Sequence, residues 1–466
     1  MKRYTWIIVL TVLSLVAAAC GTDEGTDTTA DATTTTAGAT TTAPGTDTTE
    51  SPDTTEGETG DGEPILFASS LPLTGEFSVT GTKHRDGYQF CVDEINARGG
   101  ILGREVELLV EDNRSDTEAT VNQMERFINV EDADVLLGTF SSLLGFPAST
   151  IAEQNGMIYP MPSSAALRIW ERGYENIFYF QAAAGEYTGQ SVLETLQYYT
   201  DQGIVPEMPA TASVVYADDF FAGAIANGLV GGEVAIPDSD RVVDLSPGFL
   251  VDAGIELVYE EVWPIGYTDW LTLANSIRTA DAELLIVSSA SVDEVIALVQ
   301  ALQTVGYSPE ALYTAQGTQA EFRDSLGDAA EGIIVHSVWS PEANFTGVLG
   351  GEEYTNQEFY ESFEAAFGAA PDEDEAIPFA VSQGVEQAIR ATGTTDNAEL
   401  SEWMHARTAD EPVQTILGDF VWDERGLPTE GKTFLINQWQ GSELEFVFPV
   451  GEFPGTMDLI HPKPEW

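Results

Sequence analysis

The chain has 466 residues, of which 43% are hydrophobic, and this length suits two or three domains with sizeable cores. Its 77 acidic and 18 basic residues give a formal net charge of −59, which argues against nucleic-acid binding and against adsorption to anionic surfaces. Cys20 and Cys91 are the only cysteines in the sequence, so we expect stability to depend on packing rather than on a disulfide framework.

The N-terminal segment is typical of an export signal. Residues 1–3 form a basic start, residues 4–16 an apolar run too short to span a bilayer stably, and residues 17–19 a small-residue cleavage region. Cys20 follows directly, which resembles the lipobox of bacterial lipoproteins, although Ala17 stands where leucine is usual. We therefore expect residues 1–20 to be a lipoprotein signal peptide with Cys20 lipidated. An ordinary secretory peptide is the alternative, and both place the protein outside the cytoplasm.

Residues 21–63 are rich in Thr, Asp, Gly, Glu, Ala and Pro, with no aromatic residue, Lys or Arg. Such a segment cannot bury enough apolar surface to offset its conformational entropy, so we expect disorder. Behind a lipidated cysteine, it would act as a tether between the membrane and the folded part.

From residue 64, short apolar strands alternate with amphipathic helices. Strands are expected at residues 65–68 and 106–110, and helices at residues 81–96 and 117–129, the second helix being capped by Asp116. Alternation of this kind indicates a parallel sheet with right-handed crossovers.

Two strand-to-helix turns then follow in succession. The strand at residues 133–137 leads to a helix that begins near Ser142, and the strand at residues 157–160 leads to the turn at residues 162–165. Both turns would lie at the carboxyl ends of neighbouring parallel strands, where open α/β sheets place ligands. Hydroxyls and free N–H groups at a helix start attract an anionic or carbonyl group. The alternative is that Ser142 and Ser163 only cap helices.

The same region carries a family resemblance. The segments LPLTG at residues 71–75 and DEINARGGILGR at residues 93–104 resemble the opening of the leucine/isoleucine/valine-binding proteins. These are the substrate-binding components of ABC importers and have the type I periplasmic-binding fold. The likeness extends to the strand, acidic turn and aromatic at residues 212–221 and to the late strand and turn at residues 418–426, and it covers residues 64–466.

The resemblance implies an α/β fold with two lobes, each a mainly parallel sheet flanked by helices. The chain would cross between the lobes three times, near residues 186, 337 and 430. The first lobe would comprise residues 64–186 and 338–430, and the second residues 187–337 and 431–466. A small ligand would bind between lobes that close about a hinge.

The resemblance also implies a set of ligand-binding residues drawn from both lobes. In amino-acid-binding members, hydroxyls and backbone amides of the first lobe hold the ligand carboxylate, and the second lobe adds an aromatic residue and an acid. The corresponding residues here are Ser141, Ser142, Ser163, Ser164 and Ala165 in the first lobe, and Tyr187, Phe221 and Gln316 in the second.

Gln316 departs from the family pattern, because amino-acid-binding relatives commonly have an acid there that pairs with the ligand ammonium. Glutamine accepts a hydrogen bond but supplies no charge, so a buried ammonium facing it would be poorly compensated. Phe221 also lacks the hydroxyl of the usual tyrosine. The sequence therefore leaves an amino acid, an amide and a small carboxylate open as ligands. A second departure is the stretch at residues 231–247, which resembles an insertion in the second lobe.

We expect an extracytoplasmic, membrane-anchored binding protein that delivers a small ligand to an ABC permease. It would act as a monomer, without a cofactor, a metal or nucleic acid. A sensor that presents its ligand to a separate membrane receptor is the alternative. An exported enzyme is disfavoured, because His84, His336, His405 and His461 lack metal-ligand spacing and no nucleophile motif is present in the sequence.

The net charge gives a first testable prediction, that the protein works in a salty medium. Repulsion among acidic groups opposes folding, and salt relieves it because the Debye length falls to roughly 3 Å at 1 M. The melting temperature, followed by circular dichroism from low to molar salt, should rise clearly. A flat response would contradict the idea.

Overall fold

The computed structural model describes residues 62–429 and 434–466. The expected signal peptide, Cys20 and nearly all of the expected tether lie outside these ranges, as does the predicted crossing near residue 430. Within the described ranges, every helix is too short or too polar to cross a membrane.

The first sheet is built early in the chain from parallel strands in the order β2-β1-β3, and β4 and β5 form a parallel pair beside it. The backbone N–H of Gly138, after β3, donates to the carbonyl of Pro160 in β4 at 2.9 Å, which joins the pair to the sheet. The strands are β1 (Ile65–Leu71), β2 (Val106–Asp112), β3 (Val135–Leu136), β4 (Tyr159–Met161) and β5 (Ile177–Tyr179).

Helices cover both faces of the first sheet, because alternate residues of a strand point to opposite faces. Ile65 and Phe67 pack in a cluster with α1 and α12, whereas Ala68 packs with α2 and α3. The helices of this lobe are α1 (Ser78–Ala97), α2 (Thr117–Asn129), α3 (Ser142–Gln154), α4 (Leu167–Trp170), α11 (Asn356–Phe367), α12 (Glu373–Thr392) and α13 (Asn397–His405). Two hairpins complete it: β13 (Thr346–Leu349) with β14 (Glu352–Thr355), and β15 (Val413–Thr415) with β16 (Gly418–Phe420). We call this group of elements the first lobe.

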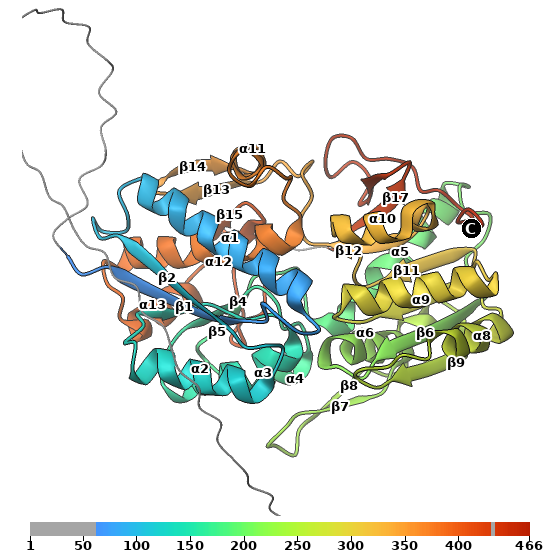
Figure 1. Ribbon diagram of the computed structural model, residues 1–466, viewed down its shortest axis with the longest axis horizontal. Helices are drawn as coiled ribbons and strands as arrows, with labels where there is room; N and C mark the ends of the chain where they lie inside the picture. The colour runs from blue at the N-terminus through green and yellow to red at the C-terminus, as the bar shows by residue number, and fades with distance from the viewer. Residues whose placement is uncertain (1–61, 430–433) are drawn as a thin grey trace, which may run out of the picture. The chain divides into compact units, whose positions relative to one another are not determined.

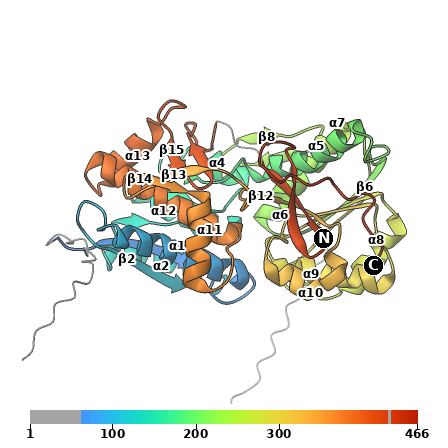
Figure 2. The same cartoon turned by 90° about the horizontal axis from the view of Figure 1, so that it is seen from above.

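Helices α1 and α12 lie side by side in both views (Figures 1 and 2). The approach is close because α1 presents Gly87 to the start of α12, where a Cβ at this position would lie 2.2 Å from the carbonyl oxygen of Glu375. Cys91, further along α1, is fully buried in the same core and unpaired, as expected for a small core residue. The packing fixes the first turn of α12 at the edge of the lobe.

The second sheet has seven strands in the order β18-β17-β12-β11-β10-β6-β9, and β9, β6, β10, β11 and β12 are parallel. Strand β17 runs antiparallel to β12 and to β18. The strands are β6 (Thr211–Ala217), β9 (Glu256–Trp263), β10 (Leu284–Ser288), β11 (Ala311–Thr314), β12 (Ile334–Ser337), β17 (Leu435–Gln440) and β18 (Glu443–Phe448). A separate antiparallel hairpin joins β7 (Glu233–Ala235) to β8 (Val242–Asp244) within the stretch that resembles an insertion.

The second sheet is also covered on both faces. In β10, Leu285 and Val287 pack with α8 and α9, whereas Leu284 and Ile286 pack with α5 and α6. The helices are η1 (Gly185–Tyr187), α5 (Thr188–Asp201), α6 (Phe220–Val230), α7 (Phe249–Asp252), α8 (Trp270–Ala280), α9 (Val292–Val305), α10 (Ala320–Leu326) and η2 (Gly327–Ala330). We call this group the second lobe. The chain enters it between β5 and α5 and leaves it after β12, while the exact boundaries of the lobes stay predictions.

Strands β1 and β2 run two or three residues longer than expected, and β4 begins at Tyr159 rather than at residue 157. In two further elements, residues distant in sequence shape the ends. Helix α1 begins at Ser78 rather than at residue 81, since the N–H of Phe77 donates to Ser115 Oγ at 3.1 Å and so extends the first turn. Strand β3 has two residues rather than five. The N–H of Leu66 donates to the side chain of Asp134, at Oδ2, at 2.9 Å, while the N–H of Asp134 still donates to the carbonyl of Leu66 at 2.9 Å.

Candidate ligand-binding site

A polar cavity lined by residues of both lobes lies where the two lobes meet. Seven of the eight residues predicted from sequence line it. The lining residues are Phe140, Ser141, Ser142, Ser163, Ser164, Ala165, Tyr179, Gln181, Phe221, Ala315, Gln316, His336, Val338, Glu373, Asp374 and Ile377.

The two successive turns of the first lobe form one wall of the cavity. Ser141 takes the N-cap position of α3 and Ser142 is its first helical residue. In the described part of the chain, the backbone N–H groups of Ser142, Ser164 and Ala165 donate no hydrogen bond. Free N–H groups and the N-terminal end of the α3 dipole make this wall electropositive. The wall therefore suits a carboxylate or carbonyl oxygen.

The serine hydroxyls do not cap helices, so that alternative is wrong. Neither Ser141 nor Ser142 accepts a cap hydrogen bond from α3, and α4 begins only at Leu167. Ser163 Oγ lies 3.1 Å from His84 Nε2, and Ser142 Oγ accepts a long bond of 3.4 Å from the N–H of Ala166. Ser141 Oγ is buried and has no hydrogen-bond partner among the residues that the structure describes. A buried hydroxyl left unpaired is costly, so a ligand or water is needed to satisfy it.

Ser164 holds the two turns together. Its backbone adopts a φ of 89°, a strained conformation for a residue other than glycine, and its Oγ donates to the carbonyl of Ser141 at 3.1 Å. Gly145 makes room for this contact, because a Cβ there would lie 1.9 Å from Ser164 Oγ. The turn after β4 is thereby fixed against the start of α3.

The second lobe supplies the opposite wall. Phe221 lies in the first turn of α6, which Asp219 caps by accepting the N–H of Ala222 at 2.8 Å. The Phe221 side chain contacts core clusters of both lobes. Gln316 Oε1 accepts a hydrogen bond from Gln319 Nε2 at 2.8 Å, which leaves the Gln316 NH₂ group and the second lone pair of Oε1 for a ligand.

Tyr187 is the predicted residue that does not line the cavity. Its side chain lies at the end of η1, is 42% exposed, and has its ring centroid 6.3 Å from that of Phe249. The structure offers no support for direct contact between Tyr187 and a ligand, and its proposed role stays a prediction.

Sequence reasoning missed the contribution of α12. Glu373 and Asp374, in its first turn, line the cavity together with His336 and Val338. Glu373 accepts from Thr318 Oγ1 and from the N–H of Val338, both at 3.0 Å. A chain with 77 acidic residues gives no local signal to separate these two from a solvated surface.

The titratable groups of the cavity wall have strongly altered pKa values. Burial, with repulsion from neighbouring acids, raises the pKa of Glu373 to about 8 and that of Asp374 to about 7. Burial lowers the pKa of His336 to about 3, so its ring is neutral at pH 7. The cavity therefore holds two carboxyl groups and no charged histidine.

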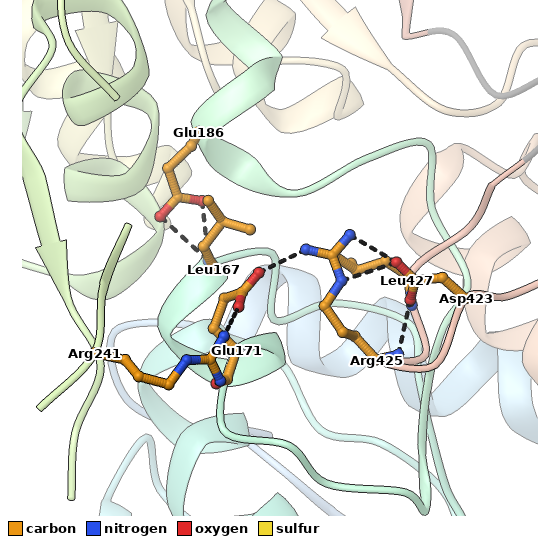
Figure 3. A network of polar contacts seen from close by, with 7 residues as sticks. All are labelled: Leu167, Glu171, Glu186, Arg241, Asp423, Arg425 and Leu427. Atoms are coloured by element: carbon orange, nitrogen blue, oxygen red, sulfur yellow. Dashed lines mark hydrogen bonds and ion pairs between the residues drawn. The ribbon is translucent and has the colours of Figure 1, made fainter. Parts of the chain in front are cut away.

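A polar network on another side of the lobe junction involves the β7–β8 hairpin (Figure 3). Arg241 of the hairpin donates to Glu171 Oε2 and to the Glu171 carbonyl, both at 2.5 Å. The other oxygen of Glu171 accepts from Arg425 at 2.6 Å, and Arg425 is also paired with Asp423. Glu171 follows α4 of the first lobe, so the hairpin links the second lobe to the first.

The structure has two sheets flanked by helices, with a polar cavity between them, and the chain passes from one sheet to the other. This arrangement is that of a two-lobed binding protein. The profile of the periplasmic binding protein family matches residues 64–231 and 237–434. The chain therefore belongs to the periplasmic binding protein family, whose members are binding proteins rather than enzymes and are extracytoplasmic. The predicted family and α/β fold are thus confirmed.

Curated relatives and solved structures agree with this assignment. The Leu/Ile/Val-binding protein homolog 7 of Brucella suis is 24% identical over 394 residues, covering 83% of this chain and 91% of the relative. The branched-chain amino acid binding protein LivJ of Streptococcus pneumoniae, in complex with isoleucine, matches with a TM-score of 0.67 at 18% identity, over 82% of this chain and 98% of LivJ. A solute-binding protein of R. palustris in complex with benzoate gives a TM-score of 0.65 at 18% identity, over 86% of this chain and 98% of that one. At this identity the solved structures establish the fold alone.

The raised carboxyl pKa values predict how stability depends on pH. Glu373, Asp374 and Glu186, the last with a pKa raised by burial to about 7, retain protons in the folded state. The unfolded chain releases these protons near pH 4.5 from the glutamates and near pH 3.8 from the aspartate. Their contribution to stability is therefore lost as pH rises through 7 and 8. His84 and His336 act oppositely, since their folded pKa values of about 3 weaken stability only below pH 6.5.

The melting temperature of the ligand-free protein should therefore rise as pH is lowered from 8.5 to 6.5, measured by calorimetry at constant ionic strength. Glu373→Gln should flatten this slope, since it removes the carboxyl with the highest pKa of the three. A melting temperature that is constant or falls over this interval would show that these carboxyls are not protonated in the folded state.

Proposed function

We propose that the protein is the extracytoplasmic, lipid-anchored substrate-binding component of an ABC importer. It binds a small polar ligand in the cavity between its lobes and delivers it to the permease. The observation that carries the proposal is the buried Ser141 hydroxyl without a partner, set among free backbone N–H groups and faced by Phe221 and Gln316 from the other lobe.

Ligand binding would proceed through an equilibrium between open and closed lobes. Each lobe supplies part of the cavity, so the full set of contacts exists only on closure, and the ligand shifts the equilibrium toward the closed state. Phe221 supports this view because it packs against both lobes and would be exposed on opening. Membership of the periplasmic binding protein family supports permease delivery, and the position of Cys20 supports lipid anchoring.

The first-lobe wall favours a ligand with a carboxylate or carbonyl group. Hydrogen-bond donors are available from Ser141 Oγ and from the free N–H groups of Ser164 and Ala165, and the start of α3 adds positive potential. The ligands named for two structural neighbours are isoleucine and benzoate. Both carry a carboxylate, but only isoleucine carries an ammonium group. The relatives named as Leu/Ile/Val-binding homologues agree with a ligand of this size.

A thermal-shift screen with amino acids, amides and small carboxylates tests the proposal. A ligand at a hundredfold excess over its Kd stabilises the folded state by about 2.7 kcal/mol, which is readily measured. Absence of any shift across the three classes would contradict a small polar ligand.

Ser141→Ala gives the sharper test once a ligand is found. Because Ser141 Oγ has no partner in residues 62–429 and 434–466, the melting temperature of the ligand-free variant should stay near that of the wild type. Loss of a ligand hydrogen bond should weaken binding by about 1–3 kcal/mol, measured by isothermal titration calorimetry. Ser213→Ala is the matched control, since that hydroxyl is also buried and unpartnered but lies in β6, outside the cavity lining. Equal affinities for the two variants would remove Ser141 from the site.

A further inference from the structure

We propose that Glu373 and Asp374 form the subsite for a cationic amino group, so that the ligand is a small zwitterion whose ammonium faces α12 and whose carboxylate faces the serine turns. The inference rests on the proposed function and narrows it to a ligand class. It places the counter-charge for the ammonium on the first lobe, whereas the sequence resemblance directs attention to residue 316 of the second lobe.

Both carboxyl groups accept hydrogen bonds, but no cation of the described residues is in direct contact with either. Asp374 Oδ2 accepts from Gln319 Nε2 at 2.8 Å and from Thr80 Oγ1 at 3.1 Å. Among the described residues, neither Glu373 nor Asp374 forms an ion pair within 4 Å. Carboxylates at a buried wall without a counter-ion are unfavourable. A ligand ammonium would supply the missing charge.

The nearby Lys83 forms ion pairs with other acidic residues. Lys83 Nζ lies 3.1 Å from Asp372, 3.3 Å from Glu375 and 3.8 Å from Glu321. Lys83 does not line the cavity that holds Ser141. The start of α12 thus presents two acids to Lys83 and two to the cavity.

Independent support comes from the opposite side of the same cavity. Ser141 Oγ is buried without a partner, and the N–H groups beside it are free, which indicates a ligand with an acceptor at that end. The cavity therefore combines an electropositive wall with an acidic one. A zwitterion matches both walls, whereas a carboxylate without an ammonium or a neutral amide matches only the serine wall.

The hydrogen bonds of Gln316 explain why glutamine can replace an acid there. Gln319 Nε2 donates both to Gln316 Oε1 and to Asp374 Oδ2, each at 2.8 Å. The Gln316 oxygen is thus occupied by a network that ends on the α12 acid. The negative charge that residue 316 lacks is present on the other side of this network.

The raised pKa values of the two acids agree with this role. Near neutral pH a fraction of each carboxyl holds a proton while no cation is bound. An ammonium at this position would favour the ionised forms and displace a proton.

The experiment compares each L-amino acid with the carboxylic acid that lacks its amino group, for example L-leucine with 4-methylpentanoate, by titration calorimetry. The proposal expects the amino acid to bind at least tenfold more tightly. Glu373→Gln and Asp374→Asn should each weaken amino-acid binding by about tenfold or more, and should weaken binding of the des-amino acid by less than about threefold. Glu321→Gln, which neutralises an acid outside the cavity lining, is the control and should change neither.

Other outcomes distinguish failure of the zwitterion subsite from failure of the proposed binding function. If des-amino acids or amides bind as tightly as amino acids, or if the two variants lose both ligands equally, the zwitterion subsite is overturned while the binding function stands. If no compound of the three classes binds, the proposed function and this inference both fail.

A second inference rests on the β7–β8 hairpin. We infer that this hairpin is a latch that holds the lobes closed over the ligand. The family profile leaves residues 232–236 unmatched; β7 of the hairpin lies in this stretch, whereas β8 lies in the matched part of the chain. Arg241 binds Glu171 of the first lobe through two hydrogen bonds, and Val243 and Leu245 pack against a core cluster of the first lobe.

Two arginines, Arg241 and Arg425, hold the Glu171 side chain in place. The Glu171 side chain is only 10% exposed and is fixed from the other side by Arg425, as Figure 3 shows. Arg241 comes from the second lobe, so its two bonds to Glu171 would be lost when the lobes separate. The hairpin therefore adds stability to the closed state that does not depend on the ligand itself.

Arg241→Ala tests the latch by stopped-flow kinetics with a ligand found in the thermal-shift screen. Dissociation should accelerate by about two- to fivefold, the range of a partly exposed ion pair, with the association rate unchanged. Arg278→Ala is the control, because this exposed arginine of α8 bonds only within the second lobe. Equal dissociation rates for the wild type and Arg241→Ala would overturn the latch.

Discussion

The hydrogen bond from Ser164 to the carbonyl of Ser141 fixes the geometry on which the ligand site depends. It joins two turns that belong to neighbouring strands, and it is possible only because Gly145 has no side chain. The strain of a left-handed serine is maintained there by the surrounding structure, which is common at sites that clamp ligands. Once the turns are joined, the free N–H groups and the unpaired hydroxyl of Ser141 line one wall of the cavity.

The parallel α/β sheets were readable from the sequence because strand and helix patterns alternate, whereas the two-lobed arrangement came from the family resemblance. The position of the serine turns beside each other was also predictable, since the carboxyl ends of parallel strands meet at one edge of a sheet. The ends of α1 and β3 were not readable, because Ser115 and Asp134 act on them through contacts that are distant in sequence. Local patterns carry no information on such contacts.

The acidic wall shows a different limit of sequence reasoning. Glu373 and Asp374 stand within a run of four acids in a strongly acidic chain, and only the packing of α1 against α12 at Gly87 places two of them at the cavity. From sequence, Gln316 suggested that the ammonium had lost its partner. The structure connects Gln316 through Gln319 to Asp374, so the absence of an acid at one position does not decide the charge of the whole site.

The most direct measurement is a crystal structure of the protein with the compound that stabilises it most in the screen. The account predicts a ligand enclosed between the lobes, with its carboxylate near Ser141 and Ser164 and its ammonium against Glu373 and Asp374. A ligand bound outside this cavity, or one bound in it with no cationic group near α12, would contradict the account.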